Sequence, residues 1–380
     1  MRLILDSEQE QLRTGLRKLL DEQASSERVR AAMESESGHD PALWRRIAAE
    51  LGLAGLTVPE EHGGAGAGQV ERAVVLEELG RSLAPVPYLA SAVLAVDALL
   101  AAGDPALQAD LLPGLASGER TGALAVSGPD GSWGSSAGTV RATRAQDGDG
   151  SWELTGTASH VLSGAVADTL LVWAGTPEGP AWFAVDAGGA GARGLTARDL
   201  AGTDPTRRFS RLGLDRTPAR RAEGGAEPAA ALEELRSRAE LALAAGQVGV
   251  MGKVLETTAE YAKVRMQFGR AIGSYQGVKH PLADLYSARE QALSAVRYAA
   301  WAGDESPERF PVAAATAIVL AAPAAFEAAA KGVQLHGGIG YTWEHDAHLY
   351  YKRAKSDELL LGEGPARLDR LADLLDRRPA

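Results

Sequence analysis

The stretch RMQFGRAIGSYQGVKHPLAD, residues 265–284, stands between two long segments of helical pattern. It begins with a cation and an aromatic, Arg265 and Phe268, and continues through a glycine-broken turn into a second helical segment. A guanidinium at a helix end offers bidentate donors to a phosphate or pyrophosphate. A plain helix C-cap explains one of these glycines but not the whole stretch. The segment therefore predicts a helical hairpin whose turn can hold a phosphorylated ligand.

A second glycine-rich stretch, VQLHGGIGYTWEHD, follows at residues 333–346. Glycine has no Cβ, so Gly337, Gly338 and Gly340 allow a ligand to approach the backbone closely. A plain helix end does not account for the two stretches together.

Outward from these stretches, the hydrophobic pattern changes twice along the chain. From residue 6 to about 116, segments such as QVERAVVLEELGRSLA place apolar residues three and four apart, which is typical of helices. From about 117 to 225, short runs such as SWELTGTASHVL and DTLLVWAG alternate with turn residues, which predicts a β-barrel or sandwich. From 227 onward a helical stripe returns, as in Leu243, Gln247, Val250 and Val254.

This order predicts an α+β multidomain protein. We place an N-terminal α-helical domain at 1–118, a central β-domain at 119–225 and a C-terminal helical domain at 226–380. A doubly wound nucleotide fold is disfavoured, because strands and helices do not alternate.

Composition excludes several classes of function. A net charge of −11 disfavours nucleic acid as a partner, and the lack of cysteine excludes disulfides and thiolate metal sites. The N-terminus has no signal-peptide pattern. The alanine-rich run at 312–326 is shorter than the roughly 20 residues of a membrane span and predicts a buried helix. We therefore expect a cytoplasmic protein without a membrane segment.

Two other chemistries have weaker signals. Glu344, His345, Asp346 and His348 include pairs with the helical spacing of metal ligands, but no matched third ligand is apparent, so a structural or substrate-facing role is favoured and we expect no metal. A serine hydrolase is disfavoured because the G-x-S-x-G motif is missing.

The motifs R-x-x-F-G, I-G-S-Y-Q-x-V-K-H-x-L-A-D and Q-L-H-G-G-I-G-Y-T resemble the acyl-CoA dehydrogenase family in order and spacing. LGLAGLTVPEEHGGAG and AVSGPDGSW resemble it too, so the similarity covers nearly the whole chain. The resemblance implies an α-helical domain, a β-barrel and a four-helix bundle. This order agrees with the one predicted from the hydrophobic pattern.

The resemblance also implies FAD held at a subunit interface. The positions that match cofactor-contacting positions of the family are Arg265, Phe268, Gln276, Gln334, Gly337, Gly338, Ser127 and His160. Arg265 is expected to reach the FAD of a neighbouring subunit. An acyl-CoA substrate, an electron-transfer flavoprotein as acceptor, a homotetramer or homodimer, and a place in fatty acid metabolism are the further implications.

The segment LLLGEGPARLDRL, residues 359–371, resembles the family segment whose glutamate removes the α-proton of the thioester. Desaturation takes a proton from Cα and a hydride from Cβ, so a base is required beside the flavin. A free carboxylate is a weak base, and we expect the site to desolvate Glu363. Without the resemblance, Glu363 is an acid at a helix N-terminus, where it opposes the helix dipole.

The chain departs from the family pattern at several positions. Ser127-Gly128-Pro129 replaces Thr-Glu-Pro, and His160-Val161-Leu162 replaces Trp-x-Thr, which removes a hydroxyl expected near the flavin. Counted from Arg353, Glu363 comes one residue late. Glu240, one position from an alternative base site of the family, is the second candidate base.

Three functions stay open from the sequence. The first is FAD-dependent α,β-dehydrogenation of an acyl-CoA. The second is a non-catalytic or half-site subunit of a hetero-oligomeric acyl-CoA dehydrogenase, suggested by His160 and Leu162. The third is a flavin-dependent monooxygenase on the same scaffold, which needs no α-proton base.

Overall fold

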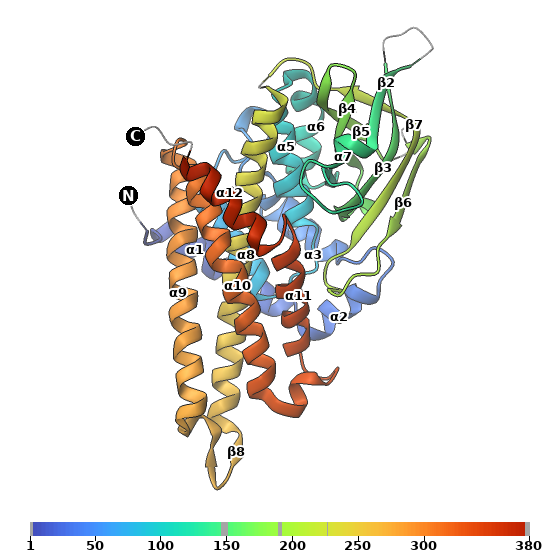
Figure 1. Ribbon diagram of the computed structural model, residues 1–380. Helices are drawn as coiled ribbons and strands as arrows, with labels where there is room; N and C mark the ends of the chain where they lie inside the picture. The colour runs from blue at the N-terminus through green and yellow to red at the C-terminus, as the bar shows by residue number, and fades with distance from the viewer. Residues whose placement is uncertain (1–2, 146–150, 189–191, 226, 377–380) are drawn as a thin grey trace.

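The computed structural model describes residues 3–145, 151–188, 192–225 and 227–376. Its N-terminal part is helical, as predicted, and lies against one side of the C-terminal helices (Figure 1). Asp6 begins the first helix with a capping box, since its carboxylate accepts from the amides of Glu8 (3.0 Å) and Gln9 (2.9 Å). The main elements are α1 (Ser7–Gln23), α2 (Ser26–Glu34), α3 (Pro41–Arg45), α4 (Gln69–Arg81), η4 (Leu89–Ala95), α5 (Val96–Ala102) and α6 (Pro105–Ser117).

The central part is a closed β-barrel, which confirms the predicted barrel or sandwich. The strands are β1 (Gly122–Ala125), β2 (Val140–Arg144), β3 (Trp152–Leu162), β4 (Thr169–Thr176), β5 (Gly179–Asp186), β6 (Leu195–Asp199) and β7 (Phe209–Arg221). The sheet closes because β5 pairs with both β4 and β7. Alternate residues such as Leu154, Leu170 and Phe183 fill the interior.

The C-terminal part contains three long helices, α8 (Pro228–Val264), α9 (Gln276–Glu305) and α10 (Phe310–His336). Two shorter helices, α11 (Ala347–Leu359) and α12 (Gly364–Asp376), pack against α10. A small hairpin of β8 (Met266–Gln267) and β9 (Arg270–Ala271) joins α8 to α9. It lies at the end of the bundle farthest from the barrel (Figure 1). We call this end, residues 265–276 and 334–343, the tip.

Glycines fix the crossing of α4 and α8. A Cβ on Gly80 would lie 2.1 Å from the carbonyl oxygen of Gly246, and one on Gly249 would lie 1.9 Å from that of Glu77. Any side chain there would force the helices apart. The N-terminal domain is thereby held directly on the long helix that leads to the tip.

The alanine-rich helix is longer than the sequence indicated. The segment from Phe310 to Tyr341 is the one helical segment among the described residues with the length and hydropathy of a membrane span, so the expectation that it is too short was wrong. More than half of its most apolar window is nevertheless buried, with Ala314, Ile318 and Ala325 inside the core. α10 is accordingly packed as a core helix, as predicted.

Candidate active site

The first cofactor motif forms the hairpin at the tip. Arg265 caps α8, its amide donating to the carbonyl of Tyr261 (2.9 Å), and its side chain is exposed. Phe268 has a positive φ of 50° at the hairpin turn and is 91% exposed. Gln276 begins α9 beside this hairpin and is also exposed. Such an exposed aromatic side chain is typical of a surface that binds another molecule.

The second motif ends α10 at the same tip. Gln334 is exposed, and Gly337 adopts a φ of 66° where the helix stops. No described atom lies within 4 Å of a Cβ built on Gly337 or Gly338, so a ligand can approach this backbone.

A buried histidine joins the two motifs. The ring of His336 packs on Tyr261 of α8 at 4.7 Å and on His345 at 4.3 Å. Its Nδ1 lies 2.7 Å from the carbonyl oxygen of Gly332. The structure therefore brings Arg265, Phe268, Gln276, Gln334, Gly337 and Gly338 to one end of the bundle.

Ser127 and His160 lie elsewhere, on the barrel. The carbonyl oxygen of Ser127 accepts from the amide of Ser159 (2.9 Å), which places Ser127 next to His160. His160 has a φ of 55° at a bulge in β3, is exposed, and its ring lies beside Gly131. Within one chain, the barrel that carries Ser127 and His160 lies far from the tip (Figure 1).

The departure at position 162 is a packing feature. Val161 and Leu162 are 0% and 6% exposed, so both side chains belong to the hydrophobic interior. Leu162 lies where the family pattern expects a hydroxyl, and no hydrogen bond from a side chain is available there.

Glu363 lies on the turn between α11 and α12. Leu361 (φ 72°) and Gly362 (φ 104°) both have positive φ, so two left-handed residues absorb the extra residue counted from Arg353. The side chain of Glu363 is exposed, and its carbonyl oxygen accepts from the amide of Arg367 (3.2 Å). The turn thus exposes the Glu363 carboxylate directly after two residues with positive φ.

The buried side chain of Arg367 donates hydrogen bonds to this turn. Its Nη2 donates to the carbonyl oxygens of Asp357 (3.2 Å) and Leu360 (2.9 Å), and the residue is 3% exposed. These are the last carbonyls of α11, which lack partners within the helix. We call Asp357, Leu360, Arg367 and the turn between them the clamped turn.

A buried ion network anchors the clamped turn to the barrel. Asp357 pairs with Arg207 on the segment between β6 and β7. Arg353, one helical turn earlier in α11, pairs with Asp204 (2.8 Å) and donates to Thr206. Burial raises the pKa of the Asp357 carboxyl, although the two guanidinium groups oppose this shift.

Glu240, the second candidate base, lies in a closed cluster. Its Oε1 accepts from Nε of Arg370 (2.8 Å) and from Nε of Arg236 (3.3 Å), and the residue is 1% exposed. Its Oε2 has no hydrogen-bond partner among the described residues. Burial raises the pKa of Glu240, and the two arginines lower it.

The sequence analysis missed Arg207, Asp357 and Arg367. Arg367 and Arg370 are three apart on α12 and both point inward. Buried arginines at helical spacing signal ion pairs within the protein. That spacing was visible in the sequence, whereas the partners were not.

Two of the four residues considered as metal ligands, Asp346 and His345, have other partners. Asp346 accepts from Nη2 of Arg30 (2.7 Å) and from Oγ of Ser26 (2.6 Å). Nδ1 of His345 accepts from the amide of Ala347 (3.1 Å). Within the described ranges, no group of three or more His, Asp or Glu residues has the arrangement of a metal site.

Comparison with known proteins agrees with this geometry. Residues 6–119 match the model of the acyl-CoA dehydrogenase N-terminal domain, and residues 231–374 match that of the acyl-CoA dehydrogenase C-terminal domain. The chain belongs to the acyl-CoA dehydrogenase family. It is an oxidoreductase of that family, and the prediction made from its motifs is confirmed.

Relatives of this acyl-CoA dehydrogenase include proteins of Mycobacterium tuberculosis. The chain is 38% identical to acyl-CoA dehydrogenase IpdE2, with 93% of each chain covered, and 37% identical to acyl-CoA dehydrogenase FadE27, with 95% of each covered. Among solved structures it resembles the ChsE4-ChsE5 complex from the same organism (34% identity, TM-score 0.89, 100% of each chain). It also resembles a variant of the Tcur3481-Tcur3483 steroid ACAD (36% identity, TM-score 0.84, 97% and 98% covered).

FAD is the cofactor of this acyl-CoA dehydrogenase, as predicted. The tip fits the nucleotide end of FAD, because Arg265 supplies an exposed cation and Gly337 and Gly338 leave open space beside the backbone. Ser127 and His160 lie at the barrel, far from the tip in one chain.

Proposed function

We propose that this acyl-CoA dehydrogenase desaturates an acyl-CoA thioester between Cα and Cβ, with Glu363 as the base that removes the α-proton. The observation that carries the proposal is the clamped turn, which presents an exposed carboxylate on a backbone held by Arg367. Bound FAD supplies the acceptor for the hydride that leaves Cβ.

The chemistry assigned to this chain is proton transfer at a Glu363 carboxylate oxygen. A carboxylate in water is a weak base, and burial against apolar surface raises its pKa. Because Glu363 is exposed in the chain, its desolvation is assigned to the substrate that packs over it. Leu361, 7% exposed, and Leu359, 48% exposed, supply neighbouring apolar surface.

Glu363 is a better candidate than Glu240 for the catalytic base, because Glu240 is already paired with two arginines. Two guanidinium groups hold Glu240, and a substrate carbon would have to displace Arg370 or Arg236 to reach it. Removing one partner from a buried ion pair is costly. Glu363 has no ion pair within the described residues and is free to meet a substrate.

The assembly follows from the divided cofactor residues. Because the tip and the barrel lie at opposite ends of one chain, a complete FAD site is assigned to a dimer or a tetramer of these chains. Reduced FAD is expected to pass electrons to an electron-transfer flavoprotein in the cytoplasm. The broad acyl-CoA class is proposed without a chain length.

The test is turnover of an acyl-CoA panel by the purified, FAD-loaded protein with an artificial electron acceptor. Glu363→Gln keeps the size of the side chain but removes the base, and should lower the rate by about 10²–10⁴-fold. Asp369→Asn, an exposed acid on α12, is the matched control and should keep the wild-type rate. Wild-type activity in Glu363→Gln would contradict the assignment of Glu363 as the base.

A second candidate function is one subunit of a hetero-oligomeric acyl-CoA dehydrogenase. It is supported by Leu162, which fills the expected hydroxyl position with buried carbon, and by the extra residue before Glu363. Two related structures carry the names of paired components, ChsE4-ChsE5 and Tcur3481-Tcur3483. A protein that, purified by itself, binds stoichiometric FAD and turns over substrate would exclude this candidate.

A further inference from the structure

A small cavity lies where the N-terminal helices meet the barrel. Its volume is about 40 Å³, and it is lined by the linker after α2, the start of η4, the end of β3 and the segment between β6 and β7. Val86, Leu89, Ala90 and Leu162 give it an apolar wall, and Arg207 and Arg208 give it a cationic one. A cavity of this size exceeds the roughly 10–15 Å³ that one water needs, so it can hold a small polar group.

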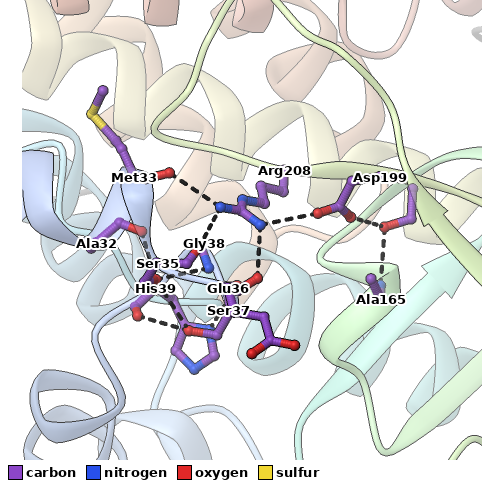
Figure 2. Close-up of polar contacts among 11 residues, drawn as sticks. Ala32, Met33, Ser35, Glu36, Ser37, Gly38, His39, Ala165, Asp199 and Arg208 are labelled. Carbon is purple, nitrogen blue, oxygen red and sulfur yellow. Dashed lines mark hydrogen bonds and ion pairs between the residues drawn. The ribbon is translucent and has the colours of Figure 1, made fainter.

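Arg208 is engaged by the protein. Figure 2 shows its guanidinium between the linker after α2 and Asp199, where Nη1 donates to the carbonyl oxygen of Glu36 (2.7 Å) and to Asp199 (3.2 Å). Its Nη2 donates to the carbonyl oxygens of Met33 (3.1 Å) and Ser35. Both terminal nitrogens are thus occupied, and Arg208 serves to join the N-terminal domain to the barrel.

Arg207, its neighbour, is only partly engaged. Its Nη1 donates to Asp357, which is its one hydrogen-bond partner in the part of the chain that the structure describes. A guanidinium carries five N–H donors, and the Arg207 side chain is only 16% exposed. Partly buried donors without acceptors are unfavourable, so a group that supplies an oxygen at this wall would gain free energy.

Two residue contacts relate the cavity to the proposed reaction site. Leu162 lines it and occupies the position expected beside the flavin. Asp357, the partner of Arg207, belongs to the clamped turn that carries Glu363. Arg207 is therefore joined through Asp357 to the segment that carries Glu363.

We infer that this cavity receives an oxygen atom of the acyl group, remote from the thioester, and that Arg207 donates to it. The inference rests on the proposed function, because it assigns a substrate class to the same site: acyl-CoAs whose acyl part bears a carbonyl, hydroxyl or carboxylate oxygen. Apolar contacts with Val86, Leu89 and Ala90 hold the adjoining carbons.

The charges around Arg207 allow either a neutral or an anionic oxygen. Arg207, Arg208 and Arg353 are each paired with an aspartate, namely Asp357, Asp199 and Asp204. The network is balanced before a ligand enters. The shared requirement is a hydrogen-bond acceptor, and the experiment separates the neutral from the anionic source.

The experiment compares three acyl-CoAs of equal chain length on the FAD-loaded protein: a plain one, one with a terminal keto group and one with a terminal carboxylate. Dissociation constants come from calorimetric titration, so the result does not depend on turnover. At least one oxygen-bearing acyl-CoA should bind about 10- to 100-fold more tightly than the plain one. Arg207→Gln should abolish that preference, measured as the ratio of the affinities of the oxygen-bearing and plain acyl-CoAs for the same variant.

Two further variants keep the test decisive. Ala165→Met places a long side chain at the exposed edge of the cavity without removing a charge, and should abolish the preference even if Arg207→Gln does not fold. Arg208→Gln, the matched arginine control, should lower stability but keep the preference of the wild type.

The outcomes separate this inference from the proposed function. Equal affinities for all three acyl-CoAs in the wild type, or an unchanged preference in Ala165→Met, overturn the role of the cavity. An unchanged preference in folded Arg207→Gln overturns the role of Arg207. Failure of every acyl-CoA to bind contradicts the proposed function itself, and this inference with it.

Discussion

The tip and the clamped turn are both built from helix ends, yet they differ in what completes them. At the tip, Arg265 and Phe268 are exposed and the backbone of Gly337 borders open space. At the clamped turn, the last carbonyls of α11 are satisfied by Arg367, and the buried Asp357 is paired with Arg207. The tip thus leaves its polar groups and open backbone accessible to a ligand, whereas the clamped turn is satisfied by contacts within one chain.

This difference teaches where binding and positioning are located. A group that must meet FAD has to keep its donors free, whereas a base that must be aimed needs a rigid support. The largest effect of mutation on stability is therefore expected at the clamped turn and the largest effect on cofactor binding at the tip.

Breaking the clamped turn should give the largest loss of stability. Asp357→Ala leaves the mostly buried Arg207 without its ion-pair partner, and should lower the free energy of unfolding by about 3–5 kcal/mol. Urea unfolding measures this change. Asp369→Ala on the exposed face of α12 is the control and should stay within about 0.5 kcal/mol of the wild type. Equal stability of the two variants would contradict the anchoring role of Asp357.

Removing the free cation at the tip should affect FAD and not folding. Arg265→Ala is expected to weaken FAD binding by about 10- to 100-fold, because hydrogen bonds to a charged phosphate are strong. Its unfolding free energy without FAD should stay within about 0.5 kcal/mol of the wild type, since the side chain is exposed. Absorbance titration with FAD at fixed salt measures the first quantity, and urea unfolding the second.

Arg270→Ala is the matched control at the tip, because this arginine on the same hairpin stacks on Tyr275 at 4.0 Å. It should retain FAD affinity within a few-fold. A loss equal to that of Arg265→Ala would mean that the hairpin as a whole, rather than one guanidinium, governs cofactor binding.

The smallest effect concerns the pH dependence of stability at His345, which packs on His336 of the tip. Burial, and next the adjacent His336, lower the pKa of His345, whose Nδ1 accepts a hydrogen bond and so favours the neutral ring. The unfolded chain then binds a proton first as pH falls below about 6.5, so stability decreases from there toward the lowered pKa. The change is expected to stay below about 1 kcal/mol, because His345 is only partly buried.

His345→Gln should flatten this part of the stability–pH curve. Burial also lowers the pKa of His348, so a smaller slope is expected to remain. Unfolding free energies at pH 7.5, 6.5 and 5.5 provide the measurement. A curve as steep as that of the wild type would show that His345 does not titrate differently in the folded and unfolded states.

Much of the fold could be predicted because it depends on local periodicity. The stripe through Leu243, Gln247, Val250 and Val254 lies on one buried face of α8, and the two glycine-rich motifs end helices at the same tip. The domain limits at 118 and 225 remain predictions, although α6 ends at Ser117 and β7 at Arg221. The roles of the cofactor residues also remain predictions.

The ion pairs could not be predicted, because they depend on pairs far apart in sequence. Arg207 and Asp357 are 150 residues apart, and neither carries a local signal of its partner. The left-handed conformations of Leu361 and Gly362, which absorb the extra residue before Glu363, were equally hidden. Backbone strain of this kind appears only when flanking helices are already fixed.

The sequence by itself determined the order of helical and β regions, the FAD motifs and the presence of an acid at position 363, because periodicity and residue chemistry are local properties. Only the tertiary structure decided that Glu240 is held between arginines, that the cofactor residues are divided between the tip and the barrel, and that Asp357 anchors the turn. These outcomes depend on which charges are buried together, and burial is set by the packing of the whole chain.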